Sequence, residues 1–237
     1  MLTPEGERLS QALRPAYRQI LDGIEEVSAS VRTSGGTLTL GTMGPQSWMI
    51  QEVVARFRDR NPAARVEHRD ISPVGPLTAL RAGELDVAHM WLPVEDPEFT
   101  VGPVTHTSPI VLLTAATHPY AERESVCRED FGELTFVSHR SPIPASMEEV
   151  FQPFHTPSGR PIARGPEVVA WDDQMKAVFA GEAVVATVAE AARFYPWPGP
   201  AFTPVRDAPP CRWAFIWRTD NPNPLIPSLA QAVPPPE

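Results

Sequence analysis

Lysine is nearly absent from this chain of 237 residues, in which Lys176 is the only one. Lysine and arginine together number 20 against 29 aspartates and glutamates, so the formal net charge is -9. No cluster of basic residues interrupts this acidic balance. Nucleic acid is bound through clustered positive charge that neutralises phosphates. We therefore expect that this chain does not bind nucleic acid by itself.

Cysteine is also scarce, and the spacings that mark catalytic or metal sites are missing. Cys127 and Cys211 belong to no CxxC or Cys/His pattern, which favours free thiols over a zinc site and leaves a redox pair as the alternative. The histidines show no HxH or HExxH spacing, and GxSxG and phosphate-loop patterns do not occur. We expect no metal, no cofactor and no catalytic activity.

Long apolar runs are missing as well. Nothing approaches the roughly 18 uninterrupted apolar residues of a membrane-spanning helix, and no N-terminal run resembles a signal peptide. We therefore expect a cytoplasmic protein without a membrane partner. The composition of 42% hydrophobic and 21% charged residues is typical of a globular protein. The length allows one large domain or two modest lobes.

An amphipathic stripe opens the chain. Apolar residues recur at steps of three or four from Leu9 to Val31, which places them on one helical face. Thr3 can cap this helix, and Gly35-Gly36 ends it. Pro15 removes a backbone hydrogen bond inside the stripe and can kink the helix. The same helix of a second copy is the favoured partner, and packing onto the chain's own body is the alternative.

Strand and helix patterns alternate through the rest of the chain. In the first half they predict strands at 37–42, 65–71, 86–92 and 101–106, with helices at 46–60 and 76–82. In the second half they predict strands at 110–114, 136–137, 168–170, 184–188 and 212–218, with helices from about 147, at 174–180 and at 225–232. Asp172 or Asp173 can cap the helix at 174–180. Such alternation implies a parallel sheet built from right-handed crossovers.

Six segments in the same order resemble the LysR-type transcriptional regulators. They are LTPEG at 2–6, ARFRDRNPAARVE at 55–67, LRAGELDVA at 80–88, AATHPYAER at 115–123, VFAGEAV at 178–184 and FIWRTDNPNP at 215–224. The resemblance implies an α/β fold of two Rossmann-like lobes joined by two crossing strands, of the periplasmic-binding-protein type II, preceded by a long linker helix. A small effector would bind between the lobes.

The same resemblance implies the organisation of the chain. It places a linker and dimerisation helix at 1–34, one effector-binding subdomain at 35–108 and 207–237, and the other at 109–206. The family carries a winged helix-turn-helix before the linker helix, and this sequence starts just past it. We therefore expect a piece of a longer regulator without its DNA-binding domain.

Candidate ligand contacts follow from where α/β proteins bind ligands, at the carboxyl ends of parallel strands. The first strand-to-helix turn contains a glycine, which allows close approach to the backbone, and it leads into a helix N-terminus, which favours anions. With the equivalent turns of the second lobe and the hinge, the candidate effector-binding residues are Thr42, Met43, Gly44, Gln46, Ser47, Ser72, His89, Trp91, Thr107, Ser108, Ser138, His139, Arg140, Trp171, Asp172 and Thr187.

Several candidates have purely structural alternatives. Thr42, Ser47 and Asp172 can serve only as helix caps. Arg140 can bind a ligand carboxylate or a surface glutamate. His89 is more typical of a satisfied core histidine, and tryptophan in a domain of this size is more often a core residue than part of a ligand wall.

We therefore expect the effector-sensing and oligomerisation region of a LysR-type regulator. It would self-associate as a dimer or tetramer, and DNA would be bound only through the missing N-terminal domain. The alternative is a cytoplasmic small-molecule binding protein of the same two-lobed fold. An enzyme on this fold would need a general acid and base in the cleft, and the sequence shows no such pair.

Overall fold

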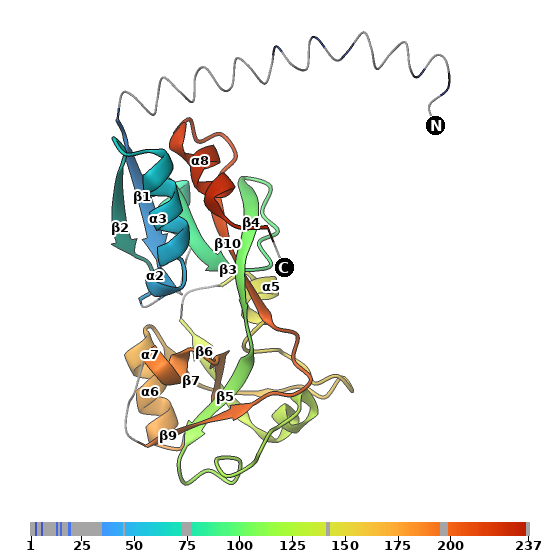
Figure 1. The fold of residues 1–237 in the computed structure, drawn as a ribbon. Helices are drawn as coiled ribbons and strands as arrows, with labels where there is room; N and C mark the ends of the chain where they lie inside the picture. Colours follow the sequence, from blue (N-terminus) through green and yellow to red (C-terminus); the bar gives the residue numbers. More distant parts are fainter. Residues whose placement is uncertain are drawn as a thin grey trace.

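Two lobes joined by two strands make up the described part of the chain (Figure 1). The computed structural model describes residues 35–44, 46–72, 77–140, 143–194 and 199–235, together with Thr3, Gly6, Leu13, Pro15 and Gln19. Across these residues we find no helix with the length and apolarity needed to cross a membrane.

The first lobe is built on a five-stranded sheet with the order β2-β1-β3-β10-β4. Its strands are β1 (Thr37–Thr42), β2 (Arg65–Asp70), β3 (Val87–Trp91), β4 (Phe99–Ser108) and β10 (Cys211–Arg218). β1 pairs in parallel with β2 and β3, which confirms the predicted parallel arrangement for these three strands. β10 runs antiparallel to both β3 and β4, so the sheet is mixed.

Four helices cover this sheet: α2 (Gln46–Met49), α3 (Gln51–Arg60), α4 (Thr78–Arg81) and α8 (Leu225–Ala232). α3 buries Val53, Val54 and Phe57 in a core that it shares with α8. The prediction of one continuous helix over 46–60 is wrong. Ile50 is fully buried, and its backbone (φ -108°, ψ 8°) leaves the helical region and separates α2 from α3.

The second lobe repeats the strand order of the first. A sheet of β8 (Val185–Val188), β5 (Ile110–Ala115) and β9 (Pro200–Pro204) lies beside a parallel pair, β6 (Thr135–His139) and β7 (Ala163–Val168). Val184 joins the two by donating its N–H to the carbonyl of Thr135 at 2.8 Å. Together these strands lie in the order β7-β6-β8-β5-β9. Neighbouring strands in this order are parallel or antiparallel in the same pattern as in β2-β1-β3-β10-β4 of the first lobe.

Its helices are η1 (Arg128–Glu133), α5 (Ala145–Glu148), α6 (Trp171–Phe179) and α7 (Ala191–Phe194). The strand predicted at 168–170 is wrong in extent, because β7 ends at Val168. The expected capping of α6 by Asp172 or Asp173 is also wrong. The helix starts at Trp171 after Ala170, without a side-chain cap, and both aspartates lie in its first turn.

Two crossings connect the lobes, β4 leading into β5 and β9 leading into β10 (green and orange-red in Figure 1). One buried cluster extends through this hinge and includes Trp91, Ile110 and Trp213. The indole N–H of Trp91 donates to the carbonyl of Met147 in the second lobe at 2.9 Å. Trp91 also packs edge-on against Phe151, with ring centroids 5.6 Å apart. The lobes therefore share a core beside their crossing strands.

Two further expectations concern the cysteines and the N-terminal helix. Cys127 and Cys211 are both free thiols, as predicted. The predicted N-terminal helix falls almost entirely outside the described residues. At its start, the N–H of Gly6 donates to Oγ1 of Thr3 at 3.2 Å, which is the contact expected of an N-cap threonine.

Candidate functional site

A cavity of about 450 Å³ lies between the two lobes. The first lobe lines it with the turn after β1, the end of β2, and side chains of β3 and β10. The second lobe lines it with the end of β6, α5, the start of α6, β8 and α7. Its volume falls in the range of roughly 300–1,000 Å³ that is typical of small-molecule pockets. Both lobes therefore enclose one space of ligand size.

Both lobes contribute aromatic side chains to the apolar part of the wall. The first lobe contributes Trp91 and Trp213, and the second contributes Phe151, Trp171 and Phe194. Trp91 and Trp213 are only 4% and 3% exposed, and their rings meet edge to face with centroids 6.1 Å apart. These buried rings give the cavity a rigid floor that spans the hinge.

The corner after β1 is completed by a carboxylate of the chain itself. Gly44 has a φ of +46°, a conformation that glycine adopts without strain. Its N–H donates to Oδ1 of Asp70, at the end of β2, at 2.8 Å. The next available N–H, that of Gln46, donates to the carbonyl of Met43 at 3.0 Å. Two backbone donors of this corner, the N–H groups of Gly44 and Gln46, are thus already engaged within the chain.

The corner after β6 contains a buried polar cluster. Nδ1 of His139 lies 3.8 Å from Oε1 of Glu148, and Nε2 of His139 lies 3.5 Å from Nε2 of Gln152. Burial lowers the pKa of His139 below its ordinary value, although Glu148 opposes this shift. The imidazole is therefore mainly neutral at pH 7. Arg164 supports the cluster from behind by donating Nη2–H to the carbonyl of Gln152 at 2.6 Å.

Formal charge around the cavity has one sign. Asp70, Glu148 and Asp172 line it, and among its described lining residues there is no lysine or arginine. The sequence of the segments at 73–76, 141–142 and 195–198 contains neither residue. Two of the lining glutamines, Gln46 and Gln152, are 7% and 3% exposed, and among the described residues Oε1 of each has no hydrogen-bond partner. The polar part of the wall is therefore acidic and rich in acceptors.

The structure brings nine of the sixteen candidate residues together at this cavity. They are Met43, Gly44, Gln46, Ser72, Trp91, His139, Trp171, Asp172 and Thr187. They come from the ends of β1, β2, β3, β6 and β8 and from the start of α6. Whether they contact a ligand stays a prediction.

The other seven candidates lie outside the described cavity lining. Three of them, Thr42, Ser47 and Ser138, form hydrogen bonds within their own lobe. Thr42 is buried beneath the first corner, and its carbonyl accepts the N–H of Ile71 at 3.0 Å. Ser47 donates its hydroxyl to the carbonyl of Gly44 at 3.5 Å. Ser138 donates to the carbonyl of Gly165 at 3.4 Å.

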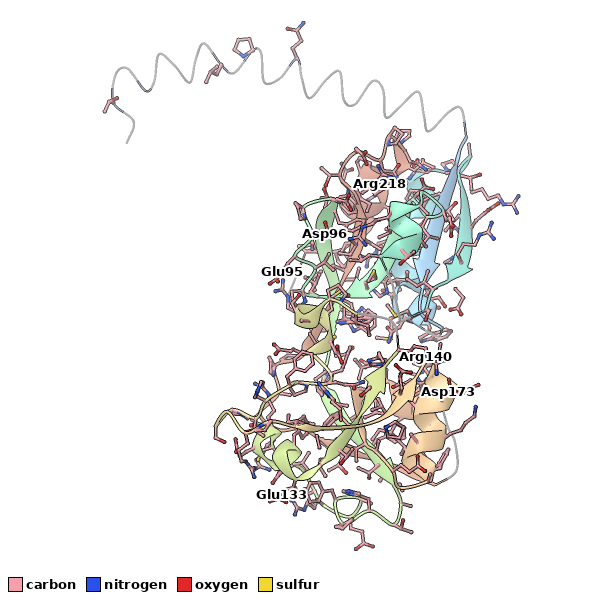
Figure 2. All side chains as sticks on the ribbon, turned by 180° about the vertical axis from the view of Figure 1, so that it is seen from behind. Glu95, Asp96, Glu133, Arg140, Asp173 and Arg218 are labelled. Atoms are coloured by element: carbon pink, nitrogen blue, oxygen red, sulfur yellow. The ribbon has the colours of Figure 1, made fainter. Side chains whose placement is uncertain are left out.

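The remaining four candidates lie in the core of the first lobe, in the hinge or on the surface. His89 is fully buried, and its Nε2 lies 2.9 Å from Oγ1 of Thr105, while its Nδ1 has no hydrogen-bond partner among the described residues. Ser108 donates to Glu190 at 2.9 Å, and Thr107 is exposed on β4. Arg140 lies at the edge of the second lobe that faces the first (Figure 2) and donates its Nε–H to exposed Glu167 at 2.9 Å.

Sequence reasoning missed several important lining residues. The clearest are Asp70, Glu148, Phe151, Gln152, Phe194 and Trp213. Asp70 had a usable signal, because it ends a parallel strand beside the first one and so reaches the same edge of the sheet. Glu148, Phe151 and Gln152 gave no such signal, since they belong to a short helix and its following turn.

Comparisons with known proteins support the same architecture. The family model described as the LysR substrate binding domain matches residues 32–233. AlsR, an HTH-type transcriptional regulator of Bacillus subtilis (strain 168), is 27% identical over 138 residues, which are 58% of this chain and 45% of AlsR. This chain therefore aligns with less than half of that relative.

Solved structures share the fold at lower identity. The BenM effector binding domain, solved with its effector benzoate, has a TM-score of 0.60 and 19% identity, over 83% of this chain and 90% of that one. Full-length CbnR, solved in complex with target DNA, has a TM-score of 0.63 and 16% identity, over 98% of this chain and 79% of that one. At such identity these likenesses establish the fold alone.

Proposed function

The chain belongs to the family of LysR substrate-binding domains, and from that premise we propose that it binds a small-molecule effector between its lobes. The observation that carries this proposal is the cavity of about 450 Å³ to which both lobes contribute side chains. A molecule held there touches two sheets that only two strand crossings and a shared core connect. The bound molecule then favours one relative placement of the lobes.

The proposed role is regulation rather than catalysis. The curated relative AlsR is a transcriptional regulator, and full-length CbnR was solved with target DNA. In this chain the effector would shift the population of lobe arrangements, and a DNA-binding domain coupled to the lobes would respond. Such coupling needs only different affinities of the effector for the two arrangements.

We further assign 35–108 with 207–237 to one subdomain, 109–206 to the other, and 1–34 to a linker helix. That helix would pair with its counterpart in a second copy and give a dimer or tetramer in the cytoplasm. Light scattering on the purified chain tests the assembly. A mass that doubles or quadruples the 26.0 kDa of one chain supports it, and a monomer at all concentrations contradicts it.

Effector binding itself is tested with a panel of small acids, amines and neutral aromatics. Binding is followed by tryptophan fluorescence and by the thermal shift of the folded chain. We expect at least one member to bind and to lose about tenfold or more in affinity in the Trp171→Leu variant. Trp48→Leu is the matched control, because Trp48 is 51% exposed and lies outside the cavity lining. A panel without any binder, or a binder insensitive to Trp171→Leu, contradicts the proposal.

A further inference from the structure

We propose that the effector is an organic cation, with a protonated amine on an apolar or aromatic body. This inference rests on the proposed function and specifies its ligand class. Three carboxylates line the cavity, those of Asp70, Glu148 and Asp172, without a lysine or arginine among the described lining residues. A ligand carboxylate entering this space would meet like charge on both lobes. A ligand ammonium would meet opposite charge on both.

Two arginines of the second lobe, Arg164 and Arg140, are engaged away from the cavity. The guanidinium of Arg164 donates to the carbonyl of Gln152 and lies over the ring of Phe154, 4.8 Å from its centroid. Its charge offsets part of that of Glu148 from behind the wall. Arg140 is paired with Glu167 on the exposed surface. Neither arginine belongs to the described cavity lining, whose formally charged residues are Asp70, Glu148 and Asp172.

The position best suited to an anion is filled from within the chain. Asp70 accepts the N–H of Gly44 at 2.8 Å in the turn after β1. A ligand carboxylate would have to displace this internal carboxylate and would then lie beside it. The turn thus presents the outer face of a carboxylate to the cavity where the sequence had suggested backbone donors.

Buried acceptors on the wall need a donor. Gln46 and Gln152 are more than nine-tenths buried, and within the described part of the chain Oε1 of each lacks a hydrogen-bond partner. A buried acceptor without a partner costs free energy that a ligand N–H can recover. The buried Nε1–H of Trp213 also lacks a hydrogen-bond partner, and it suits one uncharged acceptor atom of the ligand. The three donors of an ammonium complement the two glutamine acceptors of this wall.

The aromatic rings complete the complementarity. The faces of tryptophan and phenylalanine attract cations, and Trp is the strongest of these. Trp171 and Phe194 from the second lobe and Trp213 from the first contribute to the same cavity. The apolar body of an aralkylamine would pack against these rings while its ammonium reaches the carboxylates.

Three probes of matched shape test the inference by calorimetry at pH 7: 2-phenylethylamine, 2-phenylethanol and 3-phenylpropionate. They carry a positive charge, no charge and a negative charge. We expect the amine to bind about tenfold or more tightly than the carboxylate, with the alcohol in between. Equal or tighter binding of the carboxylate overturns the inference and leaves the proposed function standing. Failure of the amine to bind also overturns it, while the broader panel decides the proposed function.

A pair of neighbouring variants locates the charge effect. Asp172→Asn removes one lining carboxylate from an exposed position, so folding should be unaffected. Asp173→Asn is the control, because Asp173 follows on the same helix, pairs with Lys176 and lies outside the lining. We expect Asp172→Asn to weaken amine binding about threefold, to leave alcohol binding unchanged and to differ from Asp173→Asn. Equal effects of the two variants on the amine would overturn the assignment.

Discussion

The turn after β1 and the turn after β6 occupy equivalent places in two lobes with the same strand order. In the first lobe the N–H of Gly44 donates to the carboxylate of Asp70, beside the cavity. In the second lobe the N–H of Arg140 donates to the carbonyl of Val168 at 3.0 Å, and its guanidinium pairs with Glu167 outside the cavity. One topology therefore carries two different charge arrangements. The backbone positions the turns, and side chains decide which ligand charge is favoured.

The lobes also differ in how they are joined to the hinge. The first lobe contributes the buried rings of Trp91 and Trp213, and the second contributes Phe151 and the carbonyl of Met147. At the hinge, the first-lobe side chain of Trp91 thus contacts the second lobe directly. Removing one of these first-lobe rings should lower the stability of the whole protein. Substitutions on the second-lobe surface should change its stability little.

Trp91→Ala should have the largest effect. It deletes a buried ring and leaves the carbonyl of Met147 without its donor. We expect a loss of about 3–5 kcal/mol in the free energy of unfolding, measured by urea denaturation. Trp48→Ala, at an exposed position of the same lobe, should cost about 0.5 kcal/mol or less. Similar losses in the two variants would show that Trp91 does not join the lobes.

Acidification should destabilise the protein through two buried histidines of the first lobe, His89 and His106. Burial lowers the pKa of His89 well below its ordinary value, and burial lowers that of His106 to about 4. The unfolded chain therefore binds protons below about pH 6.5 that the folded chain does not, so stability falls as pH falls from about 6.5 towards 4. Above about 6.5 these two groups make no difference.

The size of this effect is up to about 1.4 kcal/mol per pH unit for each histidine that stays neutral. Melting temperatures at pH 7, 6 and 5 measure it. His89→Gln should flatten the profile, and His155→Gln, at an exposed site of the second lobe, should not. A wild-type melting temperature that does not fall between pH 7 and 5 would contradict the assignment.

Asp70→Asn should make the turn after β1 more favourable for binding an anion. It removes the charge that accepts the N–H of Gly44 and lowers the negative charge of the wall. We expect 3-phenylpropionate to gain about tenfold in affinity, which corresponds to about 1.4 kcal/mol. Asp59→Asn, on an exposed position of α3, is the control and should change nothing. No gain for the carboxylate would mean that Asp70 does not set the preference.

Arg140→Ala should have the smallest effect. Its ion pair with Glu167 is exposed on both sides, with side chains 63% and 54% accessible. Such pairs contribute about 0–1 kcal/mol, so the melting temperature should hardly move. Amine affinity should stay within about twofold by calorimetry. A large loss of binding for any probe would place Arg140 in the site after all.

The sequence predicted those elements that have a strong local pattern. β1, β2, β5 and α8 lie close to their predicted bounds, because alternating or helical apolar spacing is a property of neighbouring residues. β9 was not predicted, since it begins and ends with proline, which usually argues against a strand. The break at Ile50 was not visible either, because burial of that side chain depends on the assembled core.

The candidate site was predicted at the level of the turns and less well at the level of side chains. The cavity does lie where the strand ends converge, as the fold rule indicates. The contact between Gly44 and Asp70 joins residues 26 positions apart. The spacing of residues along the sequence therefore could not predict it, nor the ligand charge that we propose it favours. The same holds for Trp213, which reaches the cavity only because β10 returns beside β3.

A crystal structure of the chain soaked with 2-phenylethylamine tests the central claim most directly. We predict the phenyl ring between the lobes and the amine nitrogen within about 3.2 Å of a carboxylate oxygen of Asp70, Glu148 or Asp172. A probe bound elsewhere on the molecule, or one whose nitrogen points away from all three carboxylates, would contradict it.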